Sequence, residues 1–222
     1  MHIIKSEEGE VFDIELEEDL LKKNREIADK NRETLDSHKV LAIDVMGSIG
    51  SGKTSLIEKL TKSLKDRYRI SMIAGDLTTT IDADRIHRNE VEVTQINTGK
   101  ECHLDANLIK KALNELDLEK TDLLFIENVG NLICPAEFPL GSHKRVVVIS
   151  VSEGPYMVVK HPYIFIDTDL VVINKIDLAS SMDVSPENLT EDVAKIKPDV
   201  KVAKTNCRTG EGIGDVIRGL EL

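Results

Sequence analysis

The amino-acid sequence predicts an α/β fold built on a doubly wound, mostly parallel sheet. From residue 40 onward, short runs rich in Val, Ile and Leu alternate with amphipathic stretches. Most of these runs are nearly continuous in hydrophobicity, as strands buried on both faces of a sheet are. Regular alternation of strands and helices gives a parallel sheet whose ligands bind beyond the carboxyl ends of the strands. Functional motifs are therefore expected directly after strands.

Two regions are expected along the chain. Residues 1–38 are predicted to form an N-terminal helical extension, and residues 39–222 the main domain. The segment 13–38 is polar, with scattered apolar positions that fit a partly solvent-facing amphipathic helix: Leu16, Leu20, Ile27 and Leu35.

Seven aliphatic runs of the main domain are predicted to be strands. They occupy residues 40–46, 69–74, 92–96, 123–128, 146–151, 170–175 and 200–204. Helical periodicity is clear between some of them, at 53–64 and 105–116. The order of these elements is the alternation that a doubly wound sheet requires.

The composition excludes several classes of protein. With 222 residues, 41% of them hydrophobic, the chain has enough apolar material for a core, which excludes a wholly disordered chain. Aromatic residues make up only 3%, so the core is expected to be aliphatic. The formal net charge of −11 argues against a general nucleic-acid binder, which needs a basic surface.

The cellular location is predicted from what the sequence lacks. No apolar run approaches the roughly 18 residues that suggest a membrane span, and the acidic N-terminal sequence contains no signal-peptide stretch. We therefore expect a cytoplasmic protein with no membrane partner. Three cysteines are an odd, sparse set and do not form a disulfide framework: Cys102, Cys134 and Cys207.

The first predicted strand leads directly into a glycine-rich turn, GSIGSGKT, which matches the P-loop pattern G-x-x-x-x-G-K-[ST]. Agreement of strand, loop and helix argues against a chance turn. Glycines let backbone N–H groups point at phosphate oxygens, and the helix N-terminus adds positive potential. Lys53 is expected to reach the β- and γ-phosphates, and the Thr54 hydroxyl to bind Mg²⁺. The predicted nucleotide-binding residues here are Gly47, Ser48, Gly50, Ser51, Gly52, Lys53, Thr54 and Ser55.

The sixth predicted strand ends in Asn174-Lys175-Ile176-Asp177, which resembles the guanine-specificity motif N-K-x-D. A carboxylate at Asp177 can accept hydrogen bonds from guanine N1–H and the 2-amino group, and adenine offers no such pair of donors. Asn174 is expected to hold the loop and the N7 edge of the base, and Lys175 to cover the ring. The loop 205–210 takes the place where GTPases contact guanine O6 by backbone N–H. Cys207 lies in it.

Two acids are expected on the phosphate side of the sheet, because each ends a predicted strand. Asp76 follows the second strand and Glu127 ends the fourth. Such carboxylates can hold Mg²⁺ or orient the attacking water, and with Lys53 they are the predicted catalytic residues. The alternative is that either acid is only a solvated strand end. Glu127 stands where many GTPases carry D-x-x-G, and no Gln is nearby, so slow intrinsic hydrolysis that depends on a partner or on dimerisation is expected.

Cys102, His103 and Cys134 have the chemistry of a Zn²⁺ or Ni²⁺ site, but Cys134 is distant in sequence. From the residues alone, two half-buried cysteines and a surface histidine are the favoured interpretation. Sequence spacing cannot decide between the two.

Taken together, several strings resemble the HypB family of hydrogenase nickel-insertion GTPases. They are GSIGSGKT, GDLTTTIDADRI, NTGKECHLDA, ENVGNLICP and NKIDL, in family order between residues 47 and 178. The resemblance implies a P-loop GTPase of the class that dimerises on nucleotide binding. It also implies a metal site near the dimer interface, and delivery of nickel to [NiFe]-hydrogenase precursors with a partner metallochaperone.

Residue by residue, the resemblance implies that Cys102, His103 and Cys134 are metal ligands, and that Asp76 and Glu127 are the magnesium and catalytic acids. Many family members carry an N-terminal Cys-rich or His-rich metal motif, whereas the first 37 residues here hold one His and no Cys. Nickel storage and a second high-affinity site are therefore not expected. Asn107, near the cluster, is not a metal-binding residue type.

Three alternatives stay open. A urease accessory GTPase carries a C-P-H string, whereas Cys102 and His103 are adjacent here. A non-enzymatic metal-binding adaptor would use its nucleotide only to stabilise a dimer. A P-loop small-molecule kinase is disfavoured by the string N-K-I-D. Lys160 has no assigned role beyond a charge near the phosphates. Because Glu127 and Cys134 share one loop, we expect nucleotide state to control metal affinity.

Overall fold

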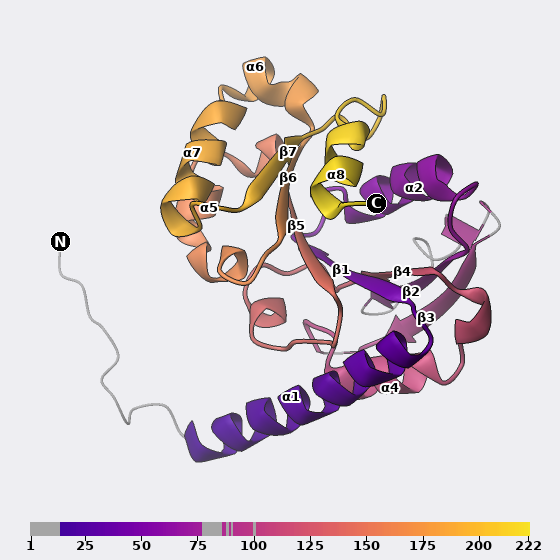
Figure 1. Cartoon of the computed structure of the whole chain (residues 1–222). Coiled ribbons are helices and arrows are strands. Elements are labelled where there is room, and N and C mark those ends of the chain that lie inside the picture. The colour runs from indigo at the N-terminus through magenta and orange to yellow at the C-terminus, as the bar shows by residue number, and fades with distance from the viewer. Residues whose placement is uncertain (1–13, 77–85, 88, 90, 100) are drawn as a thin grey trace.

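The computed structural model describes residues 14–76, 86–87, 89, 91–99 and 101–222 (Figure 1). Residues 1–13 of the predicted N-terminal extension lie outside these ranges, as do residues 77–85 of the string that resembles the HypB family. The boundary predicted between residues 38 and 39 stays a prediction.

The fold is a seven-stranded sheet in which every pair of neighbouring strands is parallel, in the order β3-β2-β4-β1-β5-β6-β7. The predicted doubly wound α/β sheet is confirmed, and all seven predicted strands are present. The strands are β1 Leu41–Gly47, β2 Ile70–Asp76, β3 Glu92–Asn97, β4 Leu123–Glu127, β5 Lys144–Ser150, β6 Leu170–Asn174 and β7 Lys201–Lys204.

In the described residues, helix α1 precedes the first strand and the other helices lie between or after the strands along the chain. The α-helices are α1 Ile14–Ser37, α2 Lys53–Leu64, α4 Ala106–Leu113, α5 Met157–Lys160, α6 Ala179–Met182, α7 Pro186–Ile196 and α8 Ile213–Leu220. Single 3₁₀ turns are η1 Leu118–Lys120, η2 Cys134–Ala136, η3 Val151–Glu153, η4 Pro162–Phe165 and η5 Ile176–Leu178. The helix predicted at 105–116 is shorter, because the Asp105 side chain caps its start by accepting from Leu108 N–H and its last helical residue is Leu113, followed by the C-cap residue Asn114.

Side chains of successive strand residues separate onto two faces of the sheet. In β1, Ile43 and Val45 pack under α2 and α8, whereas Ala42 packs under α1 and α4. Met46 belongs to a third cluster, formed with α5, α7 and η4. The fully buried hydrophobic side chains are mostly aliphatic, with Phe125 and Phe165 as the aromatic exceptions, so the expected aliphatic core is confirmed. Helices on both faces leave the carboxyl edge of the sheet open for ligands.

Helix α1 lies beside α4 on one face of the sheet, as Figure 1 shows. Its buried residues Asn24, Ala28, Asn31 and Leu35 recur at spacings of three and four, so they share one stripe of the helix. Within the described ranges, no helix is both long enough and apolar enough to cross a bilayer.

Candidate functional site

The turn between β1 and α2 has the backbone of a phosphate-binding loop. Gly52, at the N-terminal end of α2, has φ +106°, and a Cβ there would collide with the amide nitrogen of Asn174. Only glycine fits this position. Lys53 is almost fully buried, and its ammonium donates to the carbonyl oxygens of Gly47, at 3.2 Å, and Ser48, at 3.1 Å. The predicted cation is therefore held inside the loop that would wrap the phosphates.

Two residues predicted for Mg²⁺ lie in direct contact. The hydroxyl of Thr54 donates to Oε1 of Glu127 at 2.7 Å, and both side chains are buried. The contact follows from the topology, because β1 and β4 are parallel neighbours with Val45 opposite Glu127. A hydroxyl beside a carboxylate at a phosphate-binding loop is an oxygen-donor set that fits Mg²⁺. Asp76, at the end of β2, lies at the same edge of the sheet and lines the cavity described next.

A cavity of about 870 Å³ runs along the carboxyl edge of the sheet. It joins the phosphate-binding loop to Asp177 of the N-K-x-D string and to the segment 206–208. Its volume lies within the range of small-molecule sites. The predicted phosphate and base regions therefore open into one continuous space.

Asn174 connects the three loops around this cavity. Its amide nitrogen donates to the carbonyl of Ser51 at 2.9 Å, and its side-chain oxygen accepts from the Thr205 hydroxyl and the Cys207 N–H, each at 3.1 Å. The predicted role of holding the loop fits this geometry, and contact with guanine N7 stays a prediction. Cys207 N–H is directed at Asn174, and burial raises the pKa of its thiol. The expected guanine O6 contact of this loop likewise stays a prediction.

A second set of contacts links the base loop to the phosphate loop. Lys175 has φ +60°, and its ammonium donates to the Ser152 hydroxyl at 3.2 Å. The neighbouring Glu153 accepts a hydrogen bond from the hydroxyl of Ser48. Burial raises the pKa of Glu153, although the bond from Ser150 N–H and the charges of Lys175 and Lys53 oppose the rise. Sequence analysis did not single out Glu153, because nothing in its local pattern marks it.

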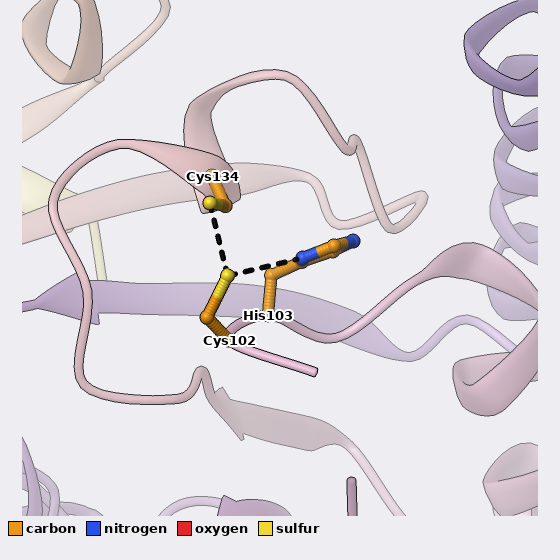
Figure 2. A group of neighbouring side chains, drawn as sticks. All are labelled: Cys102, His103 and Cys134. Atoms are coloured by element: carbon orange, nitrogen blue, oxygen red, sulfur yellow. Dashed lines mark hydrogen bonds between the residues drawn. The ribbon is translucent and has the colours of Figure 1, made fainter. Parts of the chain in front are cut away.

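Cys102, His103 and Cys134 come together in space (Figure 2). The two sulfur atoms are 3.0 Å apart, and Nδ1 of His103 is 3.9 Å from the sulfur of Cys102. One ligand atom from each of the three residues fits within 4.8 Å. The two cysteines are half-buried, as the interpretation from the residues alone expects, but they lie beside His103, as a metal site requires. Metal binding by the three residues stays a prediction. The structure supplies the proximity that spacing could not.

A metal ion binds the neutral imidazole of histidine and the thiolate of cysteine. The surroundings favour the neutral form of His103 but oppose ionisation of the Cys134 thiol. Partial burial lowers the pKa of His103, although Glu101, Asp105 and Glu137 oppose this, so the neutral imidazole is favoured. The ring lies 3.9 Å from that of Phe138, centroid to centroid. The pKa of Cys134 is raised, first by its contact with the Cys102 thiol and second by burial. Two sulfurs and an imidazole nitrogen suit Zn²⁺ and Ni²⁺.

A buried polar network beneath both sites was missed by sequence reasoning. The Asp44 carboxylate, within β1, accepts from the Asn128 amide at 3.3 Å and lies 3.8 Å from Nε of Arg145. The side-chain oxygen of Asn128 accepts from the N–H of Leu104 at 3.1 Å, one residue after His103. The only sequence signal was a single acid inside the otherwise apolar run 40–46.

Comparison with known proteins identifies the family. The model of the CobW/HypB/UreG nucleotide-binding domain matches residues 41–204. The chain is 51% identical to a probable hydrogenase maturation factor HypB of Methanocaldococcus jannaschii, over 94% of each chain. This chain belongs to the HypB family. The recognition made from the sequence strings is confirmed.

Solved structures of the HypB family have the same fold. HypB from Archaeoglobus fulgidus is 42% identical, with a TM-score of 0.84 and coverage of 90% of this chain and 98% of that one. HypB from Helicobacter pylori, solved in complex with nickel, is 35% identical, with a TM-score of 0.85 and coverage of 90% and 94%. Members of this family are P-loop GTPases, so the predicted enzyme class is supported at the level of the family.

Proposed function

We propose that this chain binds GTP with Mg²⁺ and hydrolyses it to GDP and phosphate. The observation that carries the proposal is the single cavity that extends from the phosphate-binding loop to Asp177. In this proposal Lys53 would contact the β- and γ-phosphates, Thr54 and Glu127 would bind Mg²⁺ directly or through water, and Asp76 would assist at the same edge. Asp177 would accept from the guanine N1–H and 2-amino groups.

Steady-state release of phosphate tests this proposal. We expect turnover of GTP but not ATP, and loss of turnover in Lys53→Ala. Asp177→Ala should weaken GTP binding and abolish the preference over ATP, because adenine never used that carboxylate. An exposed lysine away from the cavity, Lys39, provides a matched control as Lys39→Ala. Equal binding of ATP and GTP by the unaltered protein would contradict the proposal.

Slow intrinsic hydrolysis that speeds up on dimerisation is the second part of the proposal. Glu127 occupies the position where many GTPases carry Asp, and the sequence offers no nearby Gln to orient water. Turnover per molecule should rise with protein concentration as a nucleotide-dependent homodimer forms. Fast single-turnover hydrolysis by a dilute monomer would refute this part.

The cluster of Cys102, His103 and Cys134 supports a role as a metallochaperone that carries Ni²⁺ or Zn²⁺. HypB from Helicobacter pylori was solved in complex with nickel, and relatives are named as hydrogenase maturation factors. We propose that the cargo is delivered to [NiFe]-hydrogenase precursors with a partner nickel metallochaperone, in the cytoplasm. Nickel titration followed by thiolate absorption should give a signal that Cys102→Ser and Cys134→Ser each remove. An unchanged signal in either variant would contradict the site.

Nucleotide and metal are proposed to act on one another through the segment that joins Glu127 to Cys134. Val129 and Gly130 in this segment line the nucleotide cavity. A Cβ at Gly130 would collide with Ile49 of the phosphate loop, so the two backbones are in close contact. By linkage, a change in nickel affinity between GDP and a non-hydrolysable GTP analogue must be matched by an equal change in nucleotide affinity. Identical nickel affinities in the two states would refute the coupling.

The main competing function is a nucleotide-gated adaptor that binds metal without hydrolysis. Sedimentation with GDP or a GTP analogue, with and without nickel, would then show dimers, while phosphate release stayed at the level of Lys53→Ala. A urease-type client is separated from a hydrogenase client by testing which apo-enzyme receives nickel.

A further inference from the structure

Two buried asparagines of α1 bond to the backbone of both segments that carry the metal-ligating residues. Asn24 and Asn31 are seven residues apart, which places them two turns apart on one face of the helix. The two residues are 6% and 2% exposed. Asparagine is a poor residue for a helix interior, so intrinsic helix propensity does not explain either position.

Asn24 bridges the two segments directly. Its side-chain oxygen accepts from the N–H of Ala106 at 2.8 Å, and its amide nitrogen donates to the carbonyl of Pro139 at 2.9 Å. The N–H of Ala106 is in the first turn of α4, where backbone donors have no partner within the helix. Asn24 therefore supplies an acceptor that α4 needs and a donor that the second segment needs.

Asn31 forms a second bridge between the same two segments, two helical turns further along α1. Its amide nitrogen donates to the carbonyl of Ala106 at 2.8 Å and to the carbonyl of Leu140 at 3.1 Å. Each asparagine thus ties Ala106 to the segment 139–140. Because these groups are buried away from water, loss of a side chain would leave backbone groups without partners.

The bridged positions are close in sequence to the ligands. Ala106 comes three residues after His103, and Pro139 comes five residues after Cys134. The intervening residues have little freedom, since Asp105 caps α4 and Phe138 stacks on the ring of His103. The spacing between the two ligand-bearing segments is therefore set at the surface of α1.

The contact between α1 and the second segment is tight along its length. Gly141 has φ +93°, and a Cβ there would collide with the carbonyl oxygen of Ala28. Arg32 donates through Nε to the carbonyl of Gly141 at 2.8 Å and through Nη2 to the carbonyl of Ser142. The segment 139–142 thus follows the helix surface and cannot shift without breaking several bonds.

We propose that Asn24 and Asn31 are positioning residues for the metal site, holding Cys102 and His103 against Cys134 before any metal arrives. The inference rests on the proposed metal-carrying function. Preorganisation of this kind raises the affinity for metal, because the ligands are already ordered and binding loses less conformational entropy. The N-terminal helix is then part of the metal site although it supplies no ligand.

Zinc affinity of the full chain, measured by competition with a chromophoric chelator, tests the proposal. The double variant Asn24→Leu/Asn31→Leu keeps side-chain size and removes every bridging bond. We expect zinc affinity to fall roughly tenfold, as it does when supporting partners of ligands are removed. Affinity for a GTP analogue, measured in the same preparation, should stay within about twofold. The exposed neighbour Lys30, changed to Ala, should leave both affinities unchanged.

A second variant separates positioning from general stability. In Asn24→Asp, the ionised carboxylate still accepts from Ala106 N–H but cannot donate to Pro139, whereas a protonated carboxyl could, so zinc affinity is measured above the pKa of the new group. The variant then breaks the Asn24 bridge and leaves the Asn31 bridge and the Asp105 cap of α4 in place. We expect it to lower zinc affinity and to alter the thiolate charge-transfer bands of the cobalt-substituted protein, with circular dichroism unchanged. If the double variant does not fold, this single variant decides the question.

Different outcomes would contradict the positioning role of the asparagines and the proposed metal-carrying function. Zinc binding by the unaltered protein that is insensitive to Cys102→Ser and Cys134→Ser would overturn the proposed function. Thiolate-dependent zinc binding that is equally tight in the asparagine variants would overturn only the positioning role. A parallel fall of zinc and nucleotide affinity would also overturn it, since it would show general loosening of the fold.

Discussion

Asp44 is a buried carboxyl whose ionisation should be visible in the stability of the protein. It lies fully buried in β1, bonded to Asn128 and 3.8 Å from Arg145. Burial raises its pKa from the ordinary value of 3.8 to about 6, although the charge of Arg145 and the bond from Asn128 lower it. The desolvation free energy of the buried carboxylate is therefore larger than the stabilisation that Arg145 and Asn128 give it.

The sign of the pH dependence follows from proton binding. Below about pH 4 the carboxyl is protonated in both the folded and the unfolded chain, and ionisation costs nothing. Between pH 3.8 and about 6 only the folded chain retains the proton, so its stability falls as pH rises. Above about pH 6 both forms are ionised and the full cost is present. The difference between 3.8 and about 6 corresponds to about 3 kcal/mol, at about 1.36 kcal/mol per pH unit.

Asp44→Asn removes this titration while keeping the shape of the side chain. The free energy of unfolding of the variant, minus that of the unaltered protein, should rise by about 2 kcal/mol between about pH 4.5 and 7.5. Urea unfolding followed by circular dichroism measures it. Arg145 stays charged throughout this range, so loss of its partner adds a constant offset and no slope.

Asp122→Asn provides a contrast in the same assay. Hydrogen bonds from Arg69 hold the pKa of Asp122 at about 2, so its contribution is present above pH 3.8 and is lost only as pH falls toward 2. The Asp122→Asn difference should be flat over the measured range. Parallel profiles for Asp44→Asn and the unaltered protein would refute the account of Asp44.

Three further results are expected. Gly52→Ala should weaken binding of a GTP analogue by at least roughly tenfold in a fluorescence titration, because positive φ is strained for Ala and its methyl group would meet Asn174; unchanged affinity would contradict this geometry. Zinc affinity should rise with pH by roughly tenfold or more per unit between about pH 6 and 8, because Cys102 and Cys134 must release protons and the pKa of Cys134 is raised; a flat profile would argue against thiolate ligands. Thr61→Val should raise the free energy of unfolding by about 1 kcal/mol, because the buried Thr61 hydroxyl has no hydrogen-bond partner in the described part of the chain; a loss of stability would show that the hydroxyl is satisfied.

The elements that sequence reasoning predicted well are those whose signal is local. Each strand is a short β-branched run, and the turn at 47–54 carries its own pattern, so both are visible in a window of a few residues. The parallel topology then places Glu127 beside Thr54, since each follows or ends a strand at the same edge. This much of the site could be derived without coordinates.

The parts that could not be derived depend on contacts between distant segments. Cys102 and Cys134 are 32 residues apart, and their spacing is compatible with a cluster or with two separate sites. Asn24 and Asn31 look like ordinary solvated helix positions until α4 and the segment 139–142 are known to pack on them. Asp44 sits within an apolar strand, but its partner Arg145 is about one hundred residues away. In each case the sequence gives the residue type but does not give the distant residue that it contacts in the fold.

The nucleotide cavity and the cluster of Cys102, His103 and Cys134 are connected by a buried network of side-chain contacts. Asn128 directly follows Glu127, and its side-chain oxygen accepts from the N–H of Leu104, beside His103. Arg145, paired with Asp44, donates to the carbonyl of Pro135 at 2.8 Å, beside Cys134. Each ligand-bearing segment is thus bonded on one side to α1 and on the other to a buried network that begins next to the acid expected to bind Mg²⁺. If nucleotide binding displaces Glu127, this network offers a route by which the displacement reaches both ligand-bearing segments. The proposed change of metal affinity on GTP binding would then need a displacement of one segment relative to the other, and not a rearrangement of the whole fold.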